Sequence, residues 1–434
     1  MKIFKAGFLA GLMVLAILIT PGVTGAQNSR GCAWPIELSP EGYGNATGPE
    51  TLARYFVMPF DTHYDTMTIK GIYPGARYFS YAVYVTNEDG NPARIAGART
   101  LYDTQIAPDQ GSVNPFVKPG GSNGTYTILV KRAGESSGNT IGLSQEKPKD
   151  YRLAWVMLRI YIPSADPSLT GNSLTGGVPL PIIRLNGAEV PTCSSVNKLP
   201  DLSFLLAGLF PFDLVGDGGT PASDRLWFAP MKNPPMSLLP NPDNKYIAML
   251  PGADYQPGRI IVIHGKAPGT PSTYDGSPIW APARGFRAVD MRYWSVCAAN
   301  FALPVTTVGC TADLTTKLEG GYYTIVISDD LKRPDWLRPN VNWLPWGDAK
   351  YPKIVFFRNM LPAPGFPFSI QKAVTESDCS FDFDLPNIPN SDELEPAGEC
   401  AQQAMADYYP VAVWCDRSTF VHGGWQACLN GQKP

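Results

Sequence analysis

The sequence is poor in histidine, has no closely paired cysteines and carries little excess charge. It contains three histidines, and none of its eight cysteines is spaced as Cys-x-x-Cys, which argues against a structural zinc site. Charged residues make up 17% of the chain, the formal net charge is −3, and no basic patch is present. These features argue against nucleic acid as a partner. No metal site is assigned and no cofactor is expected.

Long apolar runs are absent beyond the first residues. The chain starts with a basic segment, is apolar from Gly7 to Ile19 and then reaches the small residues Thr24, Gly25 and Ala26. This run is too short to cross a hydrocarbon core of about 30 Å. The pattern is typical of a signal peptide, residues 1–26. It predicts an exported protein, periplasmic or extracellular, with no transmembrane segment after cleavage.

The eight cysteines are an even number in a chain predicted to be exported, so we expect disulfides. Eight cysteines allow 105 pairings, among which a sequence alone does not choose. Position favours Cys297 with Cys310, close together beside one strand, and Cys32 with Cys193, which bracket one domain. The remaining four are expected to pair among themselves: Cys379, Cys400, Cys415 and Cys428.

Glycine and proline are abundant, while the apolar share stays at 44%, which favours many short strands over disorder. Four short stretches recur in the same order, and such repeats indicate a duplicated unit. The paired stretches are residues 54–58 and 245–249, 77–80 and 292–295, 124–130 and 321–327, and 159–163 and 358–362.

The repeats predict an all-β protein with two tandem jelly-roll-like β-sandwich domains and a small disulfide-rich C-terminal segment. The first domain is expected over residues 33–195 and its duplicate over 236–375. A connector spans 196–235, and residues 376–434 form an acidic, cysteine-rich tail too small to build a core of its own.

Three motifs of the second copy carry a resemblance to a known family. They are Tyr293-Trp294-Ser295, Asn342-Trp343-Leu344-Pro345 and residues 356–362. At these positions the second copy resembles the uncharacterised domain-of-unknown-function family twelve-fourteen. The first copy resembles it more distantly, because it lacks the Asn-Trp-Leu-Pro turn. The chain also resembles exported hypothetical proteins with loops like that at residues 109–116. The resemblance implies a jelly-roll-like sandwich and no established reaction.

Four arginines recur within the aromatic strands of both copies. An arginine inside a sandwich must be paired or lie at a rim, so these residues either form ion pairs or recognise an anion. His264 and Lys266 end a β-branched run and could contact a ligand. No catalytic residue is assigned. The ligand-binding candidates are Arg77, Asp103, Asp109, Arg159, His264, Lys266, Arg292, Trp294 and Arg358.

These residues favour a recognition or envelope-associated protein for a glycan or small anionic ligand over an enzyme. One alternative is a secreted glycan hydrolase whose paired carboxylates are Asp103 with Asp109, or Asp313 with Asp348. Another is a purely structural envelope protein. Ca²⁺ could bind the loop of Asp103, Asp109 and Asn114, although no EF-hand spacing is present. Loop aromatics could form a sugar-stacking platform: Tyr274, Trp280, Trp336, Trp343 and Trp346.

Overall fold

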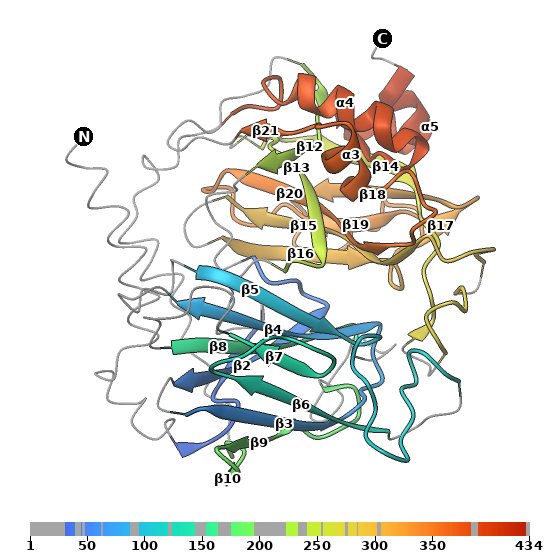
Figure 1. Ribbon diagram of the computed structural model, residues 1–434. Coiled ribbons are helices and arrows are strands. Elements are labelled where there is room, and N and C mark those ends of the chain that lie inside the picture. Colours follow the sequence, from blue (N-terminus) through green and yellow to red (C-terminus); the bar gives the residue numbers. More distant parts are fainter. Residues whose placement is uncertain are drawn as a thin grey trace.

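The computed structural model is built mainly of antiparallel strands, which confirms the all-β prediction (Figure 1). It describes residues 31–39, 45, 48–61, 64–86, 95–119, 124–143, 153–163, 175–194, 223–232, 241–252, 255–273, 277–283, 285–301, 305–382 and 389–430. The predicted signal peptide and most of the predicted connector lie outside these residues. We call the strands up to β10 the first half and those from β11 onward the second half.

The first half contains two five-stranded sheets packed face to face around a core of alternating apolar side chains. One sheet has the order β1 (Ile36–Leu38), β2 (Ala53–Asp61), β8 (Leu153–Tyr161), β4 (Tyr78–Thr86) and β5 (Ile95–Tyr102). The other has the order β10 (Ala188–Val190), β9 (Ile182–Leu185), β3 (Thr66–Ile72), β6 (Thr125–Lys131) and β7 (Thr140–Gly142).

The second half contains two six-stranded sheets. One runs β16 (Thr306–Ala312), β15 (Met291–Asn300), β20 (Lys353–Pro362), β13 (Asn244–Met249), β12 (Ala229–Lys232) and β21 (Phe381–Asp382). The other runs β11 (Arg225–Leu226), β22 (Val411–Asp416), β14 (Arg259–Lys266), β18 (Tyr322–Ser328) and β17 (Leu318–Glu319), and β19 (Asn342–Pro345) pairs with β18.

The two halves share one strand order. The order β2-β8-β4-β5 corresponds to β13-β20-β15-β16, and β9-β3-β6-β7 corresponds to β22-β14-β18-β19. In each half, the last two strands of the second of these orders pair in parallel: β6 with β7 in the first half and β18 with β19 in the second. In each copy the tyrosine of the first repeated stretch lies opposite the arginine of the last one, Tyr55 with Arg159 and Tyr246 with Arg358. The repeated stretches therefore occupy equivalent positions, while the exact domain limits stay a prediction.

A glycine faces a buried tyrosine at the same place in each half. Gly71 is the strand partner of Tyr126, and Gly265 is the strand partner of Tyr323. A Cβ atom on Gly71 would lie 2.4 Å from the Tyr126 hydroxyl, and one on Gly265 would lie 2.6 Å from the Tyr323 hydroxyl. Each tyrosine ring thus crosses its neighbouring strand where only glycine leaves room.

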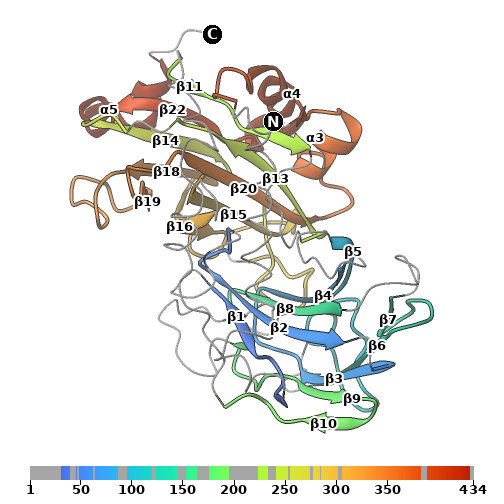
Figure 2. The same cartoon turned by 90° about the vertical axis from the view of Figure 1, so that its left-hand side faces the viewer.

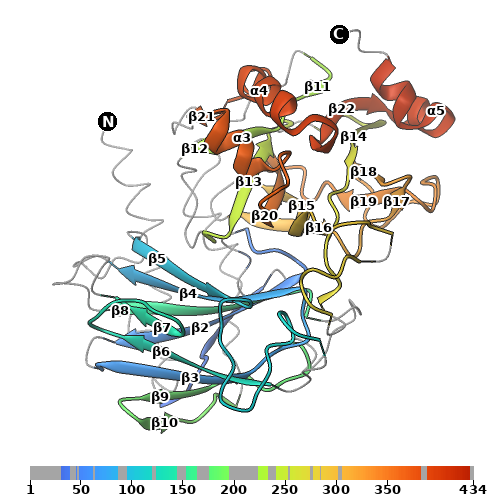
Figure 3. The ribbon, with the colours of Figure 1, turned by 45° about the vertical axis from the view of Figure 1, so that its right-hand side comes forward.

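The C-terminal tail completes the second half. Its strand β22 lies between β11 and β14, so the tail contributes to the sheet and the core that the preceding residues begin. Three helices and a 3₁₀ turn pack around it, as Figure 3 shows. They are α3 (Ile370–Glu376), α4 (Glu395–Met405), η5 (Ala406–Tyr408) and α5 (Arg417–Asn430). No helix among the described residues is long and apolar enough to cross a membrane.

Four disulfides staple the fold, in pairings that match the positional prediction. One joins the two ends of the first half, one joins β15 to β16, one joins the segment after α3 to α4, and one joins β22 to α5. The bonds are Cys32–Cys193, Cys297–Cys310, Cys379–Cys400 and Cys415–Cys428. Disulfide content is confirmed, as expected for a chain whose tail has little core of its own.

The halves pack against each other through the sheets that contain β4 and β15 (Figure 2). Tyr78 and Tyr161 of the first half join Tyr293 and Met360 of the second in one buried cluster. The rings of Tyr161 and Tyr293 meet edge to face at a centroid distance of 5.2 Å. This aromatic contact fixes the surroundings of the recurring arginines.

Candidate functional site

Two of the recurring arginines form reciprocal ion pairs between the halves. Arg77 of the first half lies 3.1 Å from Asp313 of the second, and Arg292 of the second lies 2.6 Å from Asp103 of the first. All four side chains are buried. Burial raises the pKa of Asp103 and of Asp313 above the usual range, and the partner arginine opposes that shift in each case.

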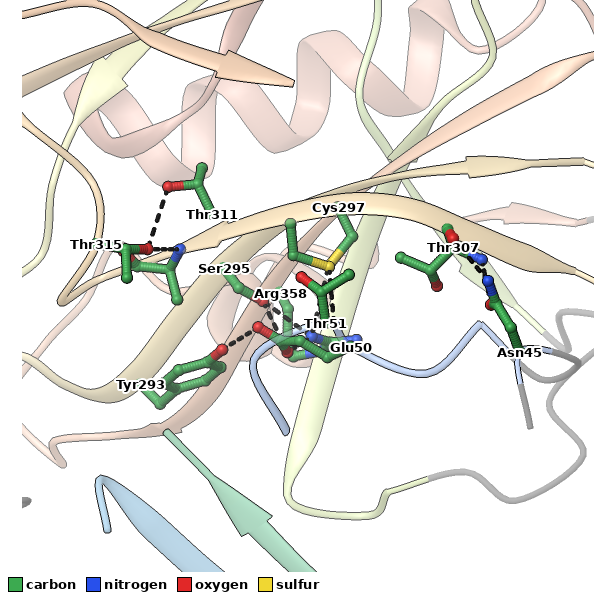
Figure 4. The surroundings of a disulfide bond; sticks show 12 residues. Asn45, Glu50, Thr51, Tyr293, Ser295, Cys297, Thr307, Thr311, Thr315 and Arg358 are labelled. Atoms are coloured by element: carbon green, nitrogen blue, oxygen red, sulfur yellow. Dashed lines mark hydrogen bonds and ion pairs between the residues drawn. A yellow bond between two sulfur atoms is a disulfide. The ribbon is translucent and has the colours of Figure 1, made fainter. Parts of the chain in front are cut away.

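Arg358 pairs with Glu50 in the same interface, as Figure 4 shows. The Glu50 carboxylate also accepts hydrogen bonds from the hydroxyls of Tyr293 and Ser295. Its neighbour Thr51 donates its backbone N–H to the sulfur of Cys310, at 3.5 Å. Glu50 is fully buried, so its charge depends on these partners.

The last two buried candidates are also structural. Arg159 donates to the hydroxyl of Tyr84 and lies 5.5 Å from the centre of its ring. Trp294 is completely buried and packs on Tyr323, with ring centroids 5.2 Å apart. Together with the three ion pairs, these contacts place all four recurring arginines in the interior rather than at a solvent-facing cleft.

The loop carboxylates and amides predicted as ligands are bonded within the protein. Asp109 accepts a hydrogen bond of 2.8 Å from the hydroxyl of Thr125. The side-chain amide of Asn114 donates to the backbone carbonyls of Asp103 and Ile106, at 2.8 and 2.9 Å. Since Asp103 faces Arg292 and Asp313 faces Arg77, each of these carboxylates has its own partner.

The predicted loop aromatics do not form one platform. Trp346 is buried in the second-half core, and Trp343 and Trp336 pack against the β14–β22 face. Trp280 is 57% exposed in a segment whose neighbour Ile279 donates to the first half at Phe116. Tyr274 lies outside the described residues.

His264 and the residue after it line a cavity of about 650 Å³ in the second half. Alternate residues of β14 share one face of the strand, so His264 continues the face of Ile260 and Val262. Helix α5 packs against those two residues (Figure 3), and its residues Trp425 and Leu429 also line the cavity. Its lining residues are Trp227, His264, Gly265, Tyr322, Glu399, Gln402, Gln403, Ala406, Asp407, Tyr409, Val411, Trp425 and Leu429.

The imidazole of His264 lies nearly parallel to two neighbouring aromatic rings. The ring of Trp425 stacks on it at a centroid distance of 3.7 Å and an angle of 13°, and the ring of Tyr322 is parallel to it at 5.5 Å. Trp425 follows a break in α5 at Gly424, where φ is 68°. A positive φ favours glycine, so this residue sets the course of the chain that carries Trp425.

His264 is neutral at pH 7. Burial lowers its pKa from 6.5 to about 4, because the charged imidazolium would lose solvation. Its Nδ1 lies 3.1 Å from the hydroxyl oxygen of Thr324. A neutral imidazole flanked by aromatic rings makes this wall flat, with polar ring edges.

The opposite wall is polar and comes from the tail. Helix α4 supplies Glu399, Gln402 and Gln403, and η5 supplies Asp407. Arg225 donates to Oε1 of Gln402 at 3.0 Å, which leaves the amide N–H groups of Gln402 as donors. The cavity therefore combines stacked rings with amide donors and carboxylate acceptors, and no described lysine or arginine lines it.

Among the predicted ligand residues, the structure therefore brings His264 to a cavity and Lys266 to its edge. The Lys266 ammonium lies 4.9 Å from the ring centre of Tyr408, the neighbour of Asp407. Sequence reasoning missed the residues that come from the tail. The sequence did not reveal these residues because β22 pairs with β14 across a long sequence separation. Tail helices with Trp and Gln beside short strands were nevertheless a usable signal.

Comparison with known proteins gives structural neighbours only. No protein-family model matches the sequence, and no curated protein matches it. One similar structure is an uncharacterised protein from Burkholderia cenocepacia, 15% identical with a TM-score of 0.48, covering 83% of this chain and 85% of that one. Another is a protein from Vibrio parahaemolyticus, 12% identical with a TM-score of 0.36, covering 83% of this chain and 95% of that one.

Proposed function

We propose that this is an exported recognition protein, periplasmic or extracellular, that binds a glycan in the His264 cavity. The stacked rings of Trp425, His264 and Tyr322 carry this proposal, since flat apolar faces pack on the apolar faces of sugar rings. Glu399, Gln402 and Asp407 supply acceptors and donors for hydroxyl groups. The four disulfides support export.

The cavity supports a glycan better than a small anion. Glu399 and Asp407 present acidic groups to a ligand, and the candidate cations at the domain interface are buried in ion pairs. A bound anion would meet repulsion from these two carboxylates, whereas sugar hydroxyls can donate to them. We also keep the resemblance to family twelve-fourteen as a proposal; its Asn342 ties β19 to Lys317 and Thr324 by hydrogen bonds.

The test is a thermal-shift and titration screen of the mature chain against neutral, acidic and amino oligosaccharides. A ligand at 100 times its Kd should stabilise the protein by about 2.7 kcal/mol. Trp425→Ala should abolish the shift, and Trp280→Ala, which removes an exposed ring outside the cavity, should preserve it. The proposal would be contradicted if no oligosaccharide shifted the melting temperature, or if Trp425→Ala and Trp280→Ala reduced the shift equally.

A hydrolase remains the second candidate, because two carboxylates line the same cavity. Any oligosaccharide that binds should be incubated with the protein and its products separated by chromatography. Shortened products that disappear in Glu399→Gln or Asp407→Asn would favour the hydrolase. Unchanged oligosaccharide would favour recognition alone.

A further inference from the structure

One buried lysine of the second half faces an asparagine instead of a carboxylate. Lys353 begins β20, is 3% exposed and lies directly opposite Asn300, the last residue of β15. Within the described part of the chain, no carboxylate forms an ion pair with it. A buried ammonium without a counter-ion is costly, so this arrangement calls for a reason.

The side-chain amide of Asn300 is held with its oxygen toward the amine. The Nζ atom of Lys353 donates to Oδ1 of Asn300 at 2.7 Å and also to the backbone carbonyl of Asp348. On the other side, Nδ2 of Asn300 donates to the hydroxyl oxygen of Thr306 at 2.9 Å. The amide is thus polarised at its oxygen, and its nitrogen lies beside a hydroxyl.

Burial brings the neutral amine within reach near neutral pH, although the aromatic rings and carbonyl oxygens around it stabilise the ammonium. The Nζ atom lies 5.6 Å from the ring centre of Trp346 and 6.0 Å from that of Tyr351. Burial among these groups lowers the pKa of Lys353 from 10.5 to about 8, and the charge of Asp348 opposes the shift. An unprotonated amine is the form that acts as a nucleophile.

We propose that Lys353 and Asn300 join in an intramolecular amide bond that cross-links β15 to β20. The neutral amine attacks Cγ of Asn300, a bond forms between Nζ and Cγ, and the bond from Cγ to Nδ2 breaks. One amine proton passes to the leaving nitrogen, which departs as ammonia, and the hydroxyl of Thr306 lies where it can relay that proton. Atoms and electrons balance with no oxidant or metal.

Such a bond would serve a protein outside the cell. It would lie in the sheet that also contains the Cys297–Cys310 disulfide, and a reductant that opens the disulfide would leave it intact. The inference is independent of the glycan cavity, which is built on the other sheet of the second half.

The test is the mass of the full mature chain, reduced and denatured, with its N-terminus determined in the same experiment. The expected mass is that of the sequence less one ammonia. A proteolytic digest should contain a branched peptide that joins the segments around residues 300 and 353. This measurement on the wild-type chain decides the question even if a variant fails to fold.

Lys353→Met should restore the full sequence mass. Lys317→Met is the matched control, because Lys317 also donates to a backbone carbonyl but is exposed, and it should keep the deficit. Loss of ammonia by backbone imide formation at an Asn-Gly pair, such as Asn186-Gly187, would persist in Lys353→Met and give no branched peptide. A full-mass wild type after incubation above the pKa of Lys353, or a deficit without a branched peptide, would overturn the proposal.

Discussion

The two halves have one strand order but differ in what lies on their outer sheets. In the first half, β3 and β6 alternate between buried and less buried residues, as expected for a sheet with one face toward solvent. In the second half, β14 and β18 have consecutive buried residues, because α5 and the tail cover the outer face. The cavity lies between that cover and the sheet, because residues of α4, η5 and α5 line it together with His264 and Tyr322. A duplicated framework thus carries its specific site on the copy that gained an extra layer.

In the interior, the two copies have arginines at equivalent positions, but these arginines have different partners. Arg358 pairs with the carboxylate of Glu50, whereas the equivalent Arg159 donates to the hydroxyl of Tyr84. The carboxylate of Asp243, a residue of the second half, accepts hydrogen bonds from the hydroxyls of Tyr78 and Thr100 in the first half. The interface is therefore nearly symmetric in geometry and unequal in the groups that its equivalent arginines bond directly.

The largest effect should come from breaking that inequality. Arg358→Met leaves the buried Glu50 carboxylate with the hydroxyls of Tyr293 and Ser295 as its side-chain partners among the described residues, and it should lower the free energy of unfolding by about 3–5 kcal/mol. Arg159→Met removes the donor to the Tyr84 hydroxyl and a cation that lowers the pKa of Asp243, whose carboxylate keeps two hydroxyl donors, so it should cost about 1–3 kcal/mol. Urea unfolding of both variants measures the difference.

The control for this pair is the double variant Glu50→Gln with Arg358→Met. It removes the uncompensated charge and should recover part of the loss of Arg358→Met. An equal loss in Arg358→Met and Arg159→Met would show that the carboxylate partner does not distinguish the two copies.

The second effect compares two disulfides with the same sequence separation of 13, Cys297–Cys310 and Cys415–Cys428. Because the closed loops are equal, replacing either pair with alanine should cost about 3 kcal/mol by chain entropy. Only the second bond ties α5 to β22, so its loss alone should speed amide hydrogen exchange in residues 417–430. Equal exchange in both variants would mean that packing alone holds α5.

The sequence predicts those parts of the fold and of the site whose interacting residues lie close together along the chain. The repeated stretches predicted the shared strands, since tyrosine, glycine and β-branched residues in order define both copies. The arginines recurred visibly, but their partners did not: Asp313 and Glu50 come from the opposite half. Only part of the cavity could be predicted from the sequence. His264 lies near the end of a recognisable strand, whereas Trp425 and Asp407 reach the cavity only because β22 pairs with β14.

A smaller effect tests the two glycines that face tyrosines. Gly71→Ala and Gly265→Ala should each cost about 1–3 kcal/mol, because the added methyl group overlaps a buried ring. The stability regained when the tyrosine hydroxyl is also removed should differ between the two copies. The hydroxyl of Tyr323 has no hydrogen-bond partner in the described part of the chain, whereas that of Tyr126 lies 2.7 Å from the hydroxyl of Tyr81.

Removal of the phenol oxygen should therefore rescue Gly265→Ala better than Gly71→Ala. Tyr323→Phe removes the atom that lies nearest the new methyl group, leaving the ring carbon Cζ at 2.9 Å, and strands no other group. Tyr126→Phe leaves Cζ at 2.5 Å and leaves the Tyr81 hydroxyl without that partner. Urea unfolding of the single and double variants gives each recovery. Equal recovery in the two copies would mean that the bond between Tyr81 and Tyr126 contributes nothing measurable.

The smallest effect is the pH dependence that His264 contributes in the second half. The pKa of His264 is about 4 when folded and 6.5 when unfolded, so the unfolded chain binds more protons between these values. Stability should fall as pH drops from 6.5 to 4, by at most about 1–2 kcal/mol once partial exposure is allowed for. The equivalent residue of the first half is Lys70, which precedes Gly71 as His264 precedes Gly265. His264→Gln should flatten the urea-derived slope in this window and Lys70→Gln should leave it unchanged; an unchanged slope in His264→Gln would place the titrating group elsewhere.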